Sequence, residues 1–139
     1  MATQTRSPTG NGATSQWTGS ANPASPWLDV SDASDSTYIS RADSNGSHVF
    51  AFTAFDIASS AIASLTVTFR AARTAAGACT AQARIRVGGT SYNGTQQALT
   101  ETITDLTEVW ATNPATSVAW VEADIEGHGR ESAATVWAQ

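Results

Sequence analysis

Two consecutive segments, at 65–72 and 79–87, alternate between apolar and polar residues, and this pattern constrains the fold more than any other feature. The alternating apolar positions are Leu65, Val67, Phe69 and Ala71, followed by Ala81, Ala83, Ile85 and Val87. Because successive side chains of a strand point to opposite faces of a sheet, the pattern predicts two half-buried strands. The short break around Gly77 predicts that they pair as an antiparallel hairpin. Such a hairpin needs a second sheet over its apolar face, so we expect an all-β fold, a single antiparallel β-sandwich.

The length and composition favour one domain preceded by an arm. The chain has 139 residues, and alanine supplies much of its 41% hydrophobic fraction, so five Trp and four Phe must fill much of the core. Residues 1–26 are rich in Gly, Ser, Thr and Pro and predict an extended N-terminal arm. We expect the sandwich domain to span 27–139. Because a polar arm is disordered when free, its ordering needs contacts with its own domain or with a neighbouring chain.

The rest of the chain predicts short strands and one helix. We expect strands at 27–30, 37–40, 48–55, 96–104, 107–111 and 133–137. Apolar residues at helical spacing predict one short helix at 117–126. We place Phe50 and Phe52 in the core, opposite the apolar side chains of 65–69.

The charge restricts the classes of partner. The formal net charge is −5, and arginine carries all the permanent positive charge because the chain has no lysine. An acidic chain without a basic stripe argues against nucleic-acid binding, since phosphate contacts supply most of that affinity. The sequence has neither a run of transmembrane length nor a signal sequence at its start. We therefore expect no membrane partner and synthesis in the cytoplasm.

Residues that could support catalysis are few. Cys79 is the one cysteine, and we interpret it as a small hydrophobic residue, not as a nucleophile. His48 and His128 lie far apart in the sequence, and surface or turn positions are the commoner interpretation for both. The sequence has no Gly-x-Ser-x-Gly elbow, no phosphate-binding glycine loop and no zinc-type Cys/His spacing. We therefore predict that the protein is not an enzyme and uses no cofactor or metal.

An acidic cluster leaves two interpretations open. Asp29, Asp32 and Asp35, with Asp43 nearby in the sequence, could supply some of the six to eight oxygens that calcium needs. The run lacks the glycine and terminal glutamate of an EF-hand loop. Capping of backbone N–H groups in a solvated turn is the favoured interpretation.

The tryptophans near the C-terminus also have two interpretations. Trp110, Trp120 and Trp137 could stack on sugar rings, as in carbohydrate-binding sandwiches. Positions in the core are favoured, because alanine-rich strands leave volume that large rings must fill.

The sequence offers several candidates for protein contacts. Arg70, Arg84 and Arg86 project from the polar face of the predicted hairpin, where they could dock on an acidic neighbour or pair with the chain's own carboxylates. Trp17 is the bulky residue of the arm and its predicted anchor at an interface. The predicted protein-interaction residues are Arg6, Trp17, Trp27, Arg70, Arg84 and Arg86.

Several motifs resemble those of small β-sandwich proteins of tailed bacteriophages. The motifs are Asp35-Ser-Thr-Tyr38-Ile39-Ser40 with Phe50-x-Phe52, Val87-Gly-Gly-Thr-x-Tyr92-x-Gly94, and Val109-Trp110-Ala-Thr-Asn-Pro114-x-Thr-x-x-Ala-Trp120. The resemblance covers 27–139 and implies a jelly-roll-like sandwich. The sequence departs from the usual pattern at Gly127-His-Gly-Arg-Glu-Ser, where an apolar-Gly-apolar last strand is expected. The register of that strand is therefore left open.

The resemblance implies a structural role in a virion. We expect a capsid decoration protein that binds the major capsid protein on the outer capsid surface through its arm and sandwich edges, as a homotrimer. The alternative is a tail- or fibre-associated carbohydrate-binding module for host adhesion, whose ligand is a glycan.

Overall fold

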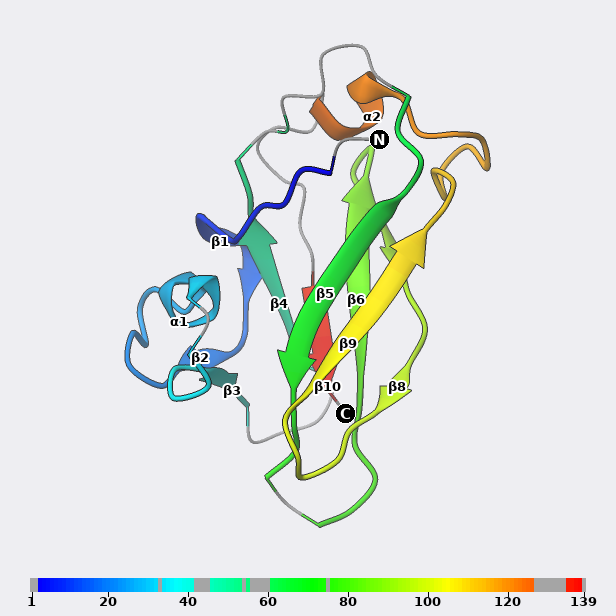
Figure 1. Ribbon diagram of the computed structural model, residues 1–139. Helices are drawn as coiled ribbons and strands as arrows, with labels where there is room; N and C mark the ends of the chain where they lie inside the picture. Colours follow the sequence, from blue (N-terminus) through cyan, green and yellow to red (C-terminus); the bar gives the residue numbers. More distant parts are fainter. Residues whose placement is uncertain are drawn as a thin grey trace.

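Figure 1 shows a computed structural model of the protein, which describes residues 3–32, 34–41, 46–53, 55, 61–74, 76–126 and 135–138. The strands within these residues are β1 (Gly10–Ser15), β2 (Thr18–Gly19), β3 (Ile39–Ser40), β4 (Gly46–Ala51), β5 (Leu65–Ala71), β6 (Thr80–Val87), β7 (Thr90–Asn93), β8 (Gln97–Ala98), β9 (Thr104–Trp110) and β10 (Thr135–Ala138). The helices are α1 (Trp27–Ser31) and α2 (Glu122–Glu126). Strands predominate, which confirms the all-β class.

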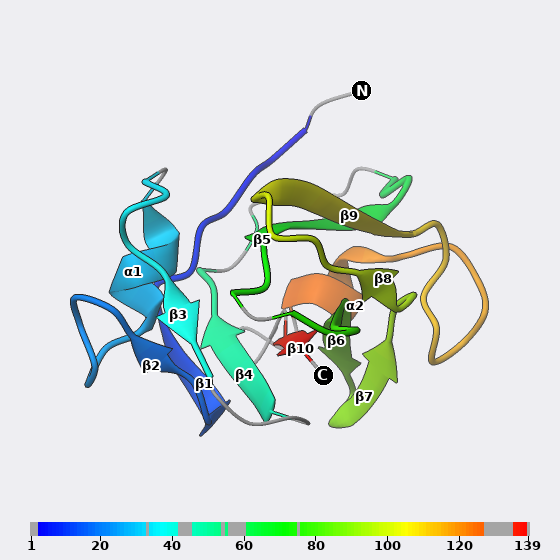
Figure 2. The same ribbon diagram turned by 90° about the horizontal axis from the view of Figure 1, so that it is seen from below.

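The strands form one large sheet and two ribbons. The large sheet is antiparallel and has the order β1-β4-β10-β6-β7, with β8 also pairing with β6. β5 pairs with β9 in one two-stranded ribbon, and β2 pairs with β3 in the other. In Figures 1 and 2 the β5–β9 ribbon lies over one face of the large sheet, while α1, β2 and β3 lie beside β1.

The hairpin predicted between the two alternating segments is wrong. β5 pairs with β9 from Leu65, opposite Trp110, to Ala71, opposite Thr104, whereas β6 belongs to the large sheet. The apolar faces of β5 and β6 meet across the layers, where Phe69 packs with residues of β6 in one cluster. Alternation specifies which face of a strand is buried but not which strand pairs with it. The connection at 72–79 is also longer than the two to five residues of tight hairpins.

Two apolar clusters lie between β6 and the β5–β9 ribbon. The first contains Phe69, Ala81, Ala83 and Leu99, with Cys79 among the half-buried residues around it. The second contains Ile85, Val87 and Trp120. Trp110 packs against both clusters and fills volume that the small side chains leave. Phe50 is buried but lies outside both clusters, and Phe52 is half-buried, so their predicted placement opposite 65–69 is not observed.

The N-terminal segment is part of the folded body. Gly10–Ser15 forms β1 at the edge of the large sheet, and Thr18–Gly19 pairs with β3. The backbone of β4 supplies the hydrogen bonds that order β1, so no neighbouring chain is needed to explain its order. The strand predicted at 27–30 is wrong, because these residues form α1 after Pro26, whose φ of −56° and ψ of −22° suit a helix start.

The helix predicted at 117–126 begins later than expected. Residues 113–118 form a turn in which the backbone oxygen of Asn113 accepts hydrogen bonds from the N–H groups of Thr116 and Ser117. The Asn113 side chain is buried, and its Oδ1 accepts a hydrogen bond from the Ala115 N–H at 2.8 Å. This local capping competes with helical hydrogen bonding, and Trp120 forms an antiparallel bridge with Ile62, so α2 starts only at Glu122. In the described part of the chain, no helix has the length and apolar character to span a membrane.

Candidate interaction surfaces

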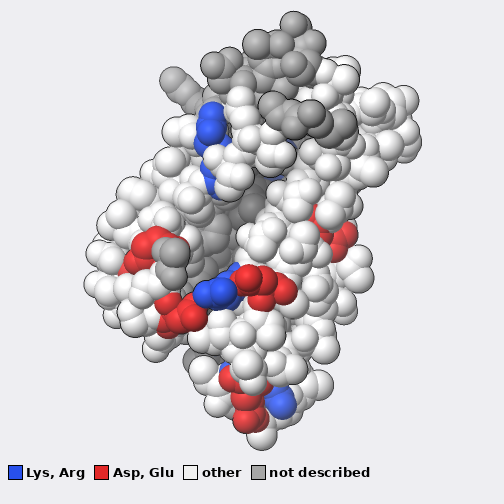
Figure 3. Space-filling view, in the orientation of Figure 1, with Lys and Arg blue, Asp and Glu red and all other residues white. Residues whose placement is uncertain are grey.

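Arg70 lies on the outer face of the β5–β9 ribbon and is paired within the chain. Its Nε lies 2.7 Å from Oδ1 of Asp105 on β9, and its terminal nitrogen lies 2.9 Å from Oδ1 of Asp35 in the α1–β3 connection. The hydrogen bond to Asp105, followed by the one to Asp35, raises the pKa of Arg70 further above its ordinary range. In Figure 3 basic and acidic atoms are adjacent on this face and form no patch of one sign.

Arg84 and Arg86 lie on the opposite outer surface of the molecule. They alternate with the buried Ala83, Ile85 and Val87 of β6, so they project from the large sheet away from the ribbon. Arg84 Nε donates to Oδ1 of Asn93 at 2.6 Å, and Arg86 Nε donates to the Gly89 oxygen at 3.1 Å. Desolvation lowers the pKa of Arg84. The expectation that these arginines share one face with Arg70 is wrong, because it depended on the β5–β6 hairpin.

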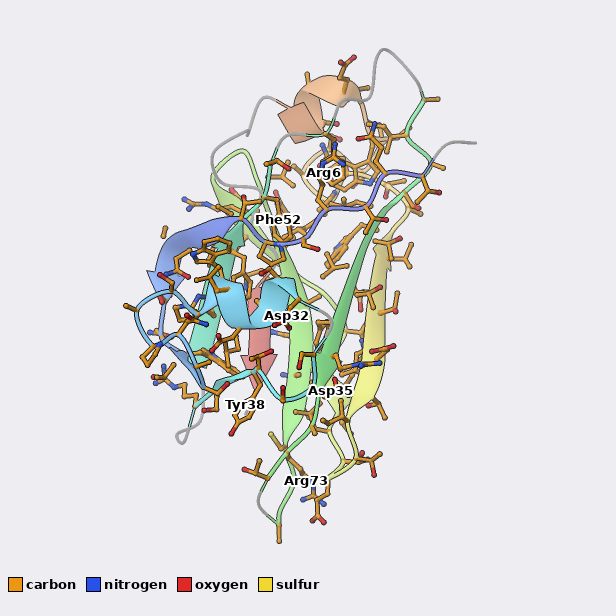
Figure 4. All side chains as sticks on the ribbon, turned by 60° about the vertical axis from the view of Figure 1, so that its left-hand side comes forward. Arg6, Asp32, Asp35, Tyr38, Phe52 and Arg73 are labelled. Atoms are coloured by element: carbon orange, nitrogen blue, oxygen red, sulfur yellow. The ribbon has the colours of Figure 1, made fainter. Side chains whose placement is uncertain are left out.

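The remaining predicted interaction residues come from the N-terminal segment. The Arg6 guanidinium lies 5.5 Å from the centre of the Phe55 ring, and Figure 4 shows Arg6 at the same end of the molecule as Phe52. Trp17 is half-buried at the bend between β1 and β2, and Trp27 is half-buried at the start of α1. The structure therefore distributes the six predicted residues over several surfaces and does not bring them together.

Asp29 connects the segment after β2 to α1. Its side chain is buried and accepts hydrogen bonds from the N–H of Ala21 at 2.9 Å, the N–H of Asn22 at 3.1 Å and the Asn22 side chain. The hydrogen bond from the Asn22 side chain is the main cause that lowers the pKa of Asp29. Gly19 is required beside it, since a Cβ there would lie 2.5 Å from Oδ2 of Asp29.

The other two aspartates of the predicted cluster have separate partners. Asp32 Oδ1 accepts from the Ser34 N–H at 3.0 Å and from the Thr37 hydroxyl at 2.9 Å, whereas Asp35 pairs with Arg70. Figure 4 shows Asp32 and Asp35 at separate positions after α1. Capping is thus observed for Asp29 and Asp32. Among the residues that the structure describes, no group of three or more His, Cys, Asp or Glu side chains could hold a metal ion.

His48 is fully buried, which the expectation of a surface or turn position did not foresee. Its ring stacks on Phe50 with the ring centres 4.5 Å apart, and Nε2 lies 3.4 Å from Oδ1 of Asn11 on β1. Nδ1 is buried and has no hydrogen-bond partner in the part of the chain that the structure describes. Desolvation lowers the pKa of His48 to about 4. The alternation of His48 with Phe50 could have indicated this position, since both side chains point to one face of β4. His128 lies outside the described residues.

Two of the three candidate sugar-binding tryptophans lie in or against the core. Trp120 is 3% exposed, and its Nε1 donates to the Trp110 oxygen at 2.8 Å. Trp110 is half-buried against both apolar clusters. The favoured core interpretation therefore holds for these two rings, whereas the side chain of Trp137 lies outside the described part of the chain. Comparison with protein-family models, with curated proteins and with solved structures found no match.

Proposed function

We propose that this protein is a virion structural protein of a tailed bacteriophage, a capsid decoration protein that binds the outer surface of the shell. We further propose that its two layers of strands form a β-sandwich of the jelly-roll type. The ground for both is the resemblance of its motifs to those of small phage sandwich proteins.

The observation that carries the proposal is where those motifs lie. Gly88 and Gly89, with φ of 58° and 81°, form the turn between β6 and β7, where a positive φ favours glycine. Trp110, Asn113 and Trp120 form the corner after β9, closed by the indole hydrogen bond and the buried asparagine cap. These residues build the scaffold and supply no reactive group. The resemblance is therefore one of scaffold, which suits a protein that acts by occupying a surface.

The outer face of the β5–β9 ribbon is the surface that we propose to face the shell. Thr66, Thr68, Thr107 and Val109 are exposed there. The charge of Arg70 is already compensated by two aspartates. Covering this face removes few unpaired charges from water, so weak contacts can form without a large desolvation cost. Repeated by symmetry, they act multivalently and stabilise the assembled lattice by mass action.

The part of the arm available to tie neighbouring copies is shorter than the sequence predicts. Thr9 N–H donates to the Ala51 oxygen at 2.8 Å, and β1 and β2 are paired from Gly10 onward. We therefore narrow the proposed tie to residues 3–8, of which Thr3, Gln4, Thr5 and Ser7 are exposed. The homotrimer and the major capsid protein stay as the proposed assembly and partner.

The test is binding to empty shells assembled from the major capsid protein of the same phage. We expect saturable binding by the full chain and at least a tenfold loss for the double variant Thr68→Glu, Thr107→Glu, which charges the proposed contact face. Thr116→Glu, on the exposed turn after β9, is the matched control and should bind normally. Absence of saturable binding by the full chain would refute the proposal.

The carbohydrate-binding alternative now depends on a different residue. Tyr38 is 54% exposed beside β3, and Figure 4 shows it pointing away from the body. An exposed aromatic ring of this kind can stack on a sugar. Titration with host polysaccharide should then change the tryptophan fluorescence in the full chain but not in Tyr38→Ala.

A further inference from the structure

His48 lies on β4 next to the edge strand β1, and its side chain faces that strand through a hydrogen bond to Asn11. The imidazole is 0% exposed, and its Nε2 faces Oδ1 of Asn11 at 3.4 Å. Because Asn11 offers a carbonyl oxygen, Nε2 carries the proton of the neutral ring and Nδ1 is left as the acceptor. Among the described residues, Nδ1 has no donor to accept from. A second proton on this ring would therefore be buried at Nδ1 without an acceptor.

β1 is held to the body by polar contacts. Its sequence is Gly-Asn-Gly-Ala-Thr-Ser, and none of its residues belongs to the two apolar clusters. Its pairing with β4 is irregular between Asn11 and Ser15. The segment after it is fixed by Gln16, whose Oε1 accepts from the Ser47 N–H at 2.8 Å. Because β1 buries little apolar area, we expect the free energy needed to detach it from β4 to be small.

The described neighbours of His48 on the adjoining strands are uncharged. β1 contributes Asn11 and Ser15, and β10 places Val136 opposite His48 in the pairing register. The charged side chain of Arg41 lies against the position of a Cβ at Gly46. Gly46 is two residues from His48, so Arg41 lies on the same face of β4. Burial is the cause that opposes protonation of this ring.

We propose that His48 is an acid-sensitive latch for the N-terminal strand: its protonation detaches β1, together with the segment before it, while the two apolar clusters stay packed. Detachment removes Asn11 from Nε2 and opens the edge of β4, so the charged ring gains water. The apolar clusters hold β5, β6 and β9 by contacts that do not involve β1.

The direction of the pH dependence follows from the lowered pKa of His48. The attached state binds the proton only near pH 4, whereas a hydrated histidine binds it near pH 6.5. The detached state therefore gains protons first, so the attachment is at full strength above pH 6.5 and weakens as the pH falls toward 4. With these two values, the equilibrium constant for detachment rises roughly 20-fold between pH 7 and pH 5.

The experiment is hydrogen exchange of the full chain between pH 7 and pH 4, corrected for the intrinsic exchange rate. We expect amides of 10–15 to lose protection roughly 20-fold by pH 5, while amides of β5 and β9 keep theirs. His48→Phe keeps an aromatic ring on Phe50 but cannot titrate, so its β1 protection should be independent of pH. His128→Gln removes the other histidine and should behave like the original chain.

A second measurement needs no variant. The ring titration of His48, followed by NMR, should coincide with the loss of β1 protection in the same sample. The latch is overturned if β1 keeps its protection down to pH 4, if β1 and β5 lose protection together, or if His48→Phe loses protection as the original chain does. It is overturned equally if the ring titrates without any change in β1.

Discussion

The N-terminal region, residues 10–41, differs from the body of β5, β6 and β9 in what holds it together. The body buries apolar side chains in two clusters, whereas the N-terminal region depends on the hydrogen bonds of Asp29, Gln16 and His48. Two tryptophans show the contrast. Trp120 donates its indole N–H to the Trp110 oxygen, but the buried indole N–H of Trp17 has no partner in the described structure. The comparison indicates a stable body with a less stable N-terminal edge.

The largest expected effect on stability comes from a substitution in the apolar core of the body. Trp120→Ala removes a 3% exposed ring from the second cluster and should lower the free energy of unfolding by about 3–5 kcal/mol. The free energy is measured by urea denaturation. Val118→Ala, at a side chain 60% exposed in the same connection, should change it by less than about 0.5 kcal/mol. Equal effects of the two substitutions would contradict the assignment of Trp120 to the core.

A smaller effect is expected from a substitution that destabilises the N-terminal region alone. Asp29→Ala leaves the N–H groups of Ala21 and Asn22 without their acceptor, and we expect Tm to fall by roughly 5 °C. Exchange protection should fall first at 19–22. Asp32→Ala, which removes an exposed cap, is the matched control and should change Tm less. If protection of β5 fell together with that of 19–22, the two regions would not be separable.

Asp29 also predicts a pH dependence in the same region. Its pKa lies below the ordinary value of 3.8, so its carboxylate stabilises the folded state above that pH. This contribution is lost as the pH falls below 3.8. The acid sensitivity of 19–22, followed by hydrogen exchange, should therefore lie below that of β1 and should disappear in Asp29→Ala.

The smallest effect concerns the link between the two regions. Arg70 joins Asp35 to the ribbon, but all three side chains are about half-exposed, so solvent screens the pairs. Arg70→Gln should lower Tm by less than about 3 °C at low salt and by nothing measurable at 0.5 M salt. A large effect that persists in salt would mean that the N-terminal region depends on this link.

Burial of the strands could be predicted from the sequence, but their partners could not. The alternation at 65–71 and 80–87 indicated which faces are buried, because side-chain direction is a local property. β5 pairs with β9, about 40 positions further along the chain, and nothing local to Leu65 indicates Trp110. Because of that error, Arg84 and Arg86 were predicted to lie on the same surface as Arg70. An error of another kind concerns α1, whose five residues are too few for a periodic signal.

The candidate site residues show the same limit. The capping role of Asp32 could be predicted, because its partners Ser34 and Thr37 are close to it in the sequence. The partners of Arg70, by contrast, come from 35 positions before it and 35 after it. The burial of His48 was within reach, since it alternates with Phe50, but its contact with Asn11 requires β1 to return to β4.

The position of β10 bears on how the protein is made. Val136 pairs with His48 on one side and with Ala83 on the other, so β10 lies between two strands that are both synthesised before it. Until β10 has been synthesised, the edges of β4 and β6 that pair with it are unpaired. By then β5 and β9 can already pair with each other. Nascent chains arrested before residue 135 should consequently be vulnerable to edge-to-edge aggregation, and chains extended beyond residue 138 should be protected from it.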